Sequence, residues 1–166
     1  LYGEYAEPFA GGAGIAMTLL LNDYVSGIYL NDVDPVIYSF WYSVLNHTEA
    51  LCDLVQSVDV SIAEWHQQRA IFQTSGAKSH LQRGFATLFL NRTNRSGILK
   101  AGVIGGLDQT GNFKLDCRFN KADLTRKIRR IGGYRDQITL TSLDALKFIK
   151  TVLPNSAKQT PETRPT

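Results

Sequence analysis

The chain has 166 residues, enough for one domain with its own core or for one domain that carries an insertion. It is 43% hydrophobic and 20% charged, as globular proteins are, and no apolar run approaches the roughly 20 residues that cross a bilayer. The net charge of +3 hides an asymmetry: residues 1–77 carry one basic side chain against nine acidic ones, whereas residues 78–166 carry seventeen against six.

The first 45 residues predict the opening of a doubly wound α/β fold. We expect strands at 2–7 and 27–30, helices at 15–21 and 36–45, and a glycine-rich turn at 8–14. Asp34-Pro35 supplies the N-cap and first position of the second helix. The order is strand, glycine loop, helix, strand, acid, helix, which is typical of that fold class.

Residues 46–136 predict a mostly helical insertion, after which the α/β pattern returns at 137–153 and an irregular tail follows at 154–166. We expect helices near 49–57, 61–74, 79–90 and 121–130, and a loop at 91–119 that allows a hairpin around Gly111-Asn112. A strand at 137–141 and a helix at 143–153, with Ser142 as its N-cap, complete the prediction.

The glycine turn and the acid behind it indicate an adenosine-bearing ligand. The run Gly11-Gly12-Ala13-Gly14 lets a ligand approach the backbone closely. Asp32, eighteen residues past Gly14, holds the usual position of a carboxylate that accepts hydrogen bonds from both ribose hydroxyls. The alternative is a tight turn with a helix-capping acid. Spacing alone does not separate S-adenosylmethionine from NAD, although the loop lacks the G-x-G-x-x-G pattern of dinucleotide sites.

Five segments, in order, resemble the Dam-type adenine-N6 DNA methyltransferases. They are "EPFAGGAG" at 7–14, similar to the cofactor loop; "LNDVD" at 30–34, the ribose motif; "FLNRTNRSG" at 89–97, an Asn-Arg segment before the DNA-contacting loop; "GNFKLDCRFN" at 111–120, a short hairpin; and "LTSLDALKFI" at 140–149, whose acid approaches the cofactor adenine. The resemblance implies a Rossmann-like sheet, S-adenosylmethionine as cofactor, and site-specific methylation of double-stranded DNA.

The cofactor-binding residues expected on this basis are Glu7, Pro8, Phe9, Ala10, Gly11, Gly12, Gly14, Asp32 and Asp144. The expected DNA-binding residues are Arg92, Asn94, Arg95, Ser96, Lys100, Lys114, Arg118, Arg126 and Arg130. Arginine and asparagine can recognise base edges, whereas lysine and serine more often meet phosphates. By resemblance, Arg95 and Ser96 occupy the positions that enter the duplex. The alternative for each DNA-binding residue is a solvated surface position.

Two departures from the family bear on catalysis. A Gly-Gly-Lys segment is not present, and no Asp-Pro-Pro-Tyr motif follows the last expected helix, where residues 154–162 are "PNSAKQTPE". In the family that motif holds the flipped adenine, so we name no catalytic residue and expect this chain alone to be inactive. A truncated or frameshifted product, with an incomplete sheet and an open apolar edge, is one interpretation; completion by a second polypeptide or by self-association is another.

The remaining expectations concern compartment and competing functions. The N-terminus lacks the features of a secretory signal, and Cys52 and Cys117 are interpreted as buried thiols in a reducing cytoplasm rather than as a disulfide or zinc site. We therefore expect a cytoplasmic protein without a metal or membrane partner. The competing functions are a non-catalytic DNA- or S-adenosylmethionine-binding module and a nicotinamide-dependent oxidoreductase.

Overall fold

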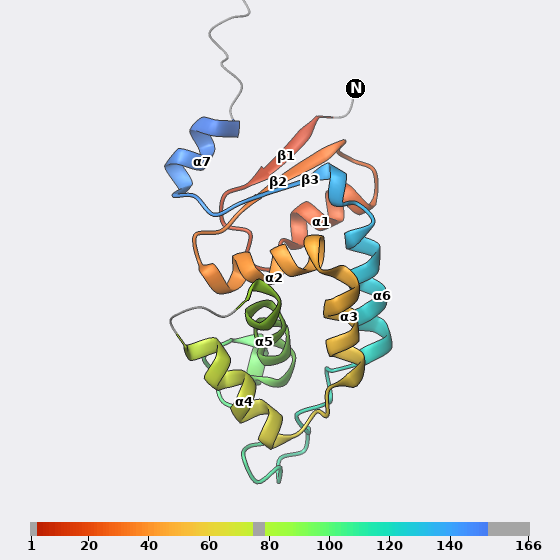
Figure 1. Cartoon of the computed structure of the whole chain (residues 1–166), viewed down its shortest axis with the longest axis vertical. Coiled ribbons are helices and arrows are strands. Elements are labelled where there is room, and N and C mark those ends of the chain that lie inside the picture. The colour runs from red at the N-terminus through yellow and green to blue at the C-terminus, as the bar shows by residue number, and fades with distance from the viewer. Residues whose placement is uncertain (1–2, 75–78, 153–166) are drawn as a thin grey trace, which may run out of the picture.

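Three short parallel strands form the sheet at one end of the computed structural model, which describes residues 3–74 and 79–152 (Figure 1). They are β1 (Glu4–Glu7), β2 (Gly27–Asn31) and β3 (Ile138–Thr141), in the order β1-β2-β3. Among the described strands β1 pairs with β2 alone. Because all three strands run the same way, their carboxyl ends meet at one edge. The α/β class and the parallel sheet expected from the sequence are confirmed.

Helices cover the sheet on both sides. In Figure 1, α1 (Gly14–Leu21) and α2 (Pro35–Asn46) lie on one side and α7 (Ala145–Val152) on the other. Ile28 and Leu30 of β2 belong to the main hydrophobic core, whereas Phe148 of α7 is fully buried outside that core. None of the described helices combines the length and the apolar character needed to span a bilayer.

The expected insertion folds as four helices, three of which pack against α2 while the other packs against one of those three (Figure 1). They are α3 (Thr48–Ser57), α4 (Ile62–Gln73), α5 (His80–Thr93) and α6 (Lys121–Gly132). The α5–α2 packing is close because residue 84 is glycine: a Cβ there would lie 2.4 Å from the Ser43 hydroxyl and 2.6 Å from the Ser39 carbonyl oxygen. One core runs from the sheet into these helices, so the insertion and the α/β part share their hydrophobic interior.

Two local expectations are wrong. The segment around Gly111-Asn112 forms turns and no strand ladder in the described chain; the Gln109 side chain bonds both the Ile104 carbonyl oxygen (2.7 Å) and the Leu115 N–H (2.8 Å) instead. Ser142 does not cap α7. The cap is Asp144, whose Oδ1 accepts from the N–H groups of Leu146 and Lys147 at 3.0 and 3.3 Å. The expected tail at 154–166 lies outside the described residues.

The carboxyl ends of the three strands are tied together by one buried side chain, Asn31, which is 1% exposed. Its Nδ2 donates to the carbonyl oxygens of Pro8 (3.0 Å) and Leu143 (2.9 Å). Its Oδ1 accepts from the Thr141 hydroxyl and the Leu143 N–H, both at 2.8 Å. All four hydrogen-bonding positions of the amide are thereby used, and the segments after β1, β2 and β3 are held in one arrangement.

Replacing Asn31 by alanine should lower the free energy of unfolding by about 3 kcal/mol, because buried carbonyl and N–H groups lose their partners. Urea unfolding measures this loss. The matched control is Asn46→Ala, since Asn46 is exposed and bonds only the Tyr42 carbonyl oxygen of its own helix. Its expected cost is below about 0.5 kcal/mol, and equal losses in the two variants would contradict the role assigned to Asn31.

Candidate functional site

The glycine loop between β1 and α1 has a defined conformation at the carboxyl edge of the sheet. Gly11 and Ala13 both adopt left-handed backbone, with φ of 46° and 47°. The Trp41 indole N–H, from the buried side of α2, donates to the Gly11 carbonyl oxygen at 2.9 Å, and the Ala10 N–H donates to the Asn31 carbonyl oxygen at 2.8 Å. Left-handed geometry at an alanine costs about 1 kcal/mol, so surrounding contacts hold this loop in shape.

Asp32 joins the glycine loop to the turn after β2. Its Oδ2 accepts from the Gly11 N–H at 2.9 Å and its Oδ1 from the Asp34 N–H at 3.0 Å. The cap of α2 is a different acid, Asp34, which accepts from the Val36 N–H at 3.0 Å. Each Asp32 oxygen keeps a further acceptor position, and the residue is partly exposed. The carboxylate is therefore positioned to accept hydrogen bonds from hydroxyl groups of a ligand.

The other residues expected at the cofactor site meet at the same edge and have distinct roles. Glu7 Oε2 accepts from the Ala16 N–H in the first turn of α1 at 3.3 Å. Pro8 supplies a carbonyl oxygen to Asn31, Phe9 is 71% exposed, and Ala10 is buried. Asp144, the cap of α7, reaches this edge because Asn31 holds the neighbouring Leu143.

The space over the loop is open. A Cβ at Gly12 or Gly14 would meet no atom within 4 Å, and the same holds at Gly11. An exposed aromatic ring, an uncovered backbone and a carboxylate with spare acceptor positions suit a nucleoside with ribose hydroxyls. The residues present thus fit an adenosine-bearing ligand.

A cavity of about 230 Å³ lies between the glycine loop and the helices α2, α5 and α6, and Gly11, Gly12 and Arg92 are among its lining residues. The Nε of Arg92 is buried without a hydrogen-bond partner in the described structure. Burial, and then the charge of Arg118, lowers the pKa of the Arg92 guanidinium. An anionic ligand group would satisfy this donor. Arg92, expected at the DNA surface, thus lines a cavity shared with the glycine loop.

Two of the residues expected to contact DNA form hydrogen bonds within the fold. Asn94 is fully buried: its Oδ1 accepts from the Trp65 indole N–H at 2.7 Å, and its Nδ2 donates to the carbonyl oxygens of Ile98 (3.1 Å) and Leu99 (2.9 Å). Arg118 donates to the carbonyl oxygens of Asn91 and Asn94. These two side chains shape the loop after α5, and we leave Asn94 out of the candidate DNA surface.

The remaining residues expected to bind DNA differ in whether their side chains already have partners within the protein. Lys114 donates to the carbonyl oxygens of Gln109 and Gly111, and Arg130 donates to that of Leu21. Arg126 pairs with Asp123. By contrast Arg95, Ser96 and Lys100 are exposed, and neither Arg95 nor Lys100 forms an ion pair within residues 3–74 and 79–152.

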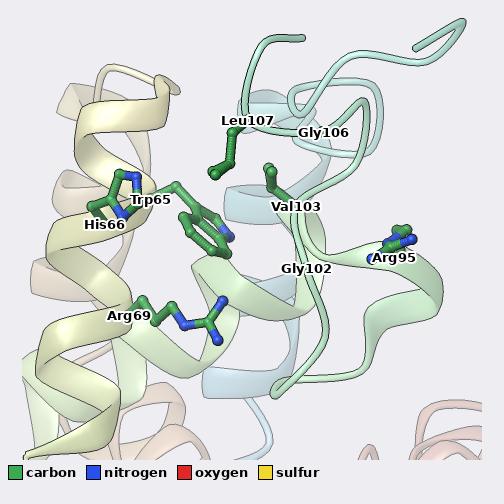
Figure 2. A pocket seen from close by; sticks show the side chains of 8 residues that line it. All are labelled: Trp65, His66, Arg69, Arg95, Gly102, Val103, Gly106 and Leu107. Atoms are coloured by element: carbon green, nitrogen blue, oxygen red, sulfur yellow. The ribbon is translucent and has the colours of Figure 1, made fainter. Parts of the chain in front are cut away.

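A hollow of about 480 Å³ that the sequence did not predict lies between α4 and the loop after α5. Figure 2 shows Trp65, His66 and Arg69 on one wall, with Arg95, Val103 and Leu107 among the residues opposite. A signal was available, because Arg69 is the one basic residue among the first 77. Taken alone, however, one arginine on an amphipathic helix did not identify a site.

The cysteines and the side chains that could bind a metal do not point to a further site. Cys52 is buried, and burial raises the pKa of its thiol. Cys117 is exposed, so the expectation of two buried thiols is wrong for that residue. In the described ranges no three His, Cys, Asp or Glu side chains gather as a metal site.

No protein-family model matches the chain, and comparison with curated proteins gave no match.

Proposed function

We propose that this chain binds S-adenosylmethionine at the carboxyl edge of its sheet and duplex DNA through its helical insertion, as part of an adenine-N6 DNA methyltransferase. The proposal combines the five family-like segments with the geometry of the loop they include. When bound, S-adenosylmethionine supplies a methyl group on a positively charged sulfur.

The observation that carries the cofactor assignment is the carboxylate of Glu7 at the start of α1. Dinucleotide sites place phosphates at this helix end, where free N–H groups and the helix dipole favour an anion. Here Glu7 already accepts from the Ala16 N–H at 3.3 Å. A second anion would meet the charge of Glu7, whereas a sulfonium ion would be attracted to it. The loop therefore favours S-adenosylmethionine over NAD.

Each residue of the edge has a role in this proposal. Asp32 accepts hydrogen bonds from the ribose hydroxyls, while Gly11 and Gly12 let the ligand approach the backbone. The exposed Phe9 ring offers an apolar face beside the loop. Asp144 keeps a second carboxylate oxygen for the amino group of the adenine, since the contacts of the described chain occupy only Oδ1. Arg92 offers a cation to the carboxylate of the cofactor or to a DNA phosphate.

The 166 residues contain no Asp-Pro-Pro-Tyr motif, so the proposed functions of this chain are binding and positioning. We propose methyl transfer to adenine for the enzyme of which this chain is proposed to be a part. The second candidate, a non-catalytic DNA- or S-adenosylmethionine-binding protein, is favoured by the same lack of the motif within the sequence. Transfer of a labelled methyl group to duplex DNA by this chain alone would exclude that second candidate.

Isothermal titration of the chain should detect binding of S-adenosylhomocysteine and not of NAD. Replacing Asp32 by alanine should weaken this binding at least tenfold, or about 1.4 kcal/mol, because charge-assisted bonds to the ribose are lost. Asp136→Ala, which removes an exposed acid outside the loop, serves as the control and should bind as the wild type does. Preferential binding of NAD, or an unchanged affinity in Asp32→Ala, would contradict the proposal.

The charge argument has its own test in Glu7→Gln, which keeps an oxygen acceptor for the Ala16 N–H and removes the negative charge. The variant should lose affinity for S-adenosylmethionine more than for S-adenosylhomocysteine, since only the first ligand carries a sulfonium charge. We expect the ratio of the two dissociation constants to change about three- to tenfold, or roughly 0.7–1.4 kcal/mol. A ratio equal to that of the wild type would show that Glu7 does not discriminate by charge.

A further inference from the structure

Arg69 lies between two adjoining hollows on the surface of α4. The first, of about 480 Å³, also includes Arg95 (Figure 2). The second, of about 420 Å³, is lined by Lys100 and also by Asp34. Arg69 lines both, and we call the two together the α4 groove. The groove therefore runs from the loop after α5 toward the turn that carries Asp32.

The guanidinium of Arg69 is held in place without a carboxylate partner. Its central carbon lies 4.8 Å from the centroid of the Trp65 ring, a cation–π contact. Trp65 is 3% exposed and fixed by its hydrogen bond to Asn94. The ion pairs of the described chain involve Asp123 and Glu49, neither of which pairs with Arg69. Arg69 thus presents a preorganised, unneutralised charge to the groove.

The opposite wall contributes two more unpaired cations. Arg95 lies along the backbone at Gly102, where an added Cβ would come within 2.9 Å of the Arg95 Nη2. Glycine at this position therefore makes room for the guanidinium. Lys100 is exposed in the second hollow. The wall of the first hollow is largely apolar, with Leu107 among its side chains, whereas in the second hollow Phe72 lies beside the polar Gln73.

We propose that the α4 groove binds the sugar–phosphate backbone of duplex DNA and that Arg69 contacts a phosphate. This inference rests on the proposed function and adds α4 to the surface expected from the sequence. Separate cations along a groove suit successive phosphates, and apolar walls suit the sugars between them. The carboxylate of Asp34 repels phosphate at the inner end, so the phosphate track stops short of the Asp32 turn.

The test measures duplex binding by fluorescence anisotropy from about 50 to 200 mM salt for the wild type, Arg69→Gln and Arg69→Lys. Arg69→Gln should weaken binding severalfold and reduce the slope of log affinity against log salt by about 0.9. Arg69→Lys keeps the charge and should retain the wild-type slope. The matched control is Lys147→Gln on α7, across the sheet from the insertion (Figure 1), which should change the affinity by less than about twofold and leave the slope at the wild-type value.

The outcomes separate this inference from the proposed function. Arg69→Gln should bind S-adenosylhomocysteine as the wild type does, which shows that the variant is folded. Duplex binding with an unchanged slope in Arg69→Gln would overturn the inference and leave the proposed function standing. Failure of the wild type to bind duplex DNA would overturn both the inference and the DNA part of the proposal. Stronger competition by polyglutamate than by unlabelled duplex would identify an acidic protein as the partner instead.

Discussion

The arrangement of the candidate site depends on the buried amide of Asn31. Its four hydrogen bonds connect the chain after β1, the end of β2 and the chain after β3, although Leu143 lies 112 residues further along the sequence. The insertion lies in the sequence between the end of β2 and the start of β3. Both ends of the insertion must therefore come back to the same edge of the sheet. A saturated buried amide enforces that geometry, because any other arrangement leaves polar groups unpaired away from water.

The charges of the chain are divided between two surfaces with different proposed partners. At the sheet edge, Glu7, Asp32 and Asp144 gather where a nucleoside with a positive sulfonium would bind. On the insertion, Arg95, Lys100 and Arg69 remain without ion pairs in the described structure. Arg69 is encoded in the acidic half of the sequence and reaches the basic surface because α4 packs along α5. The shared hydrophobic core fixes the two surfaces relative to each other.

Local signals in the sequence predicted most of the elements and the centre of the candidate site. Asp34-Pro35 marked the start of α2, and helical periodicity located α3 to α6 within a few residues. The glycine loop and Asp32 were found because backbone conformation and strand ends leave local signals. The buried roles of Asn31 and Asn94 and the Arg69–Trp65 contact were not predicted, since partners distant in sequence determine whether a polar side chain is buried. The choice between Ser142 and Asp144 as cap failed because both residue types cap helices.

One ligand site should form where the three strand ends meet. Hydrogen–deuterium exchange of the chain, with and without S-adenosylhomocysteine, tests it most directly. Ligand binding should add protection in three separate segments, at 8–14, 31–34 and 142–146, with little change in α3 or α6. Protection confined to the helical insertion, or no protection at the glycine loop under saturating ligand, would show that no such site forms at the strand ends.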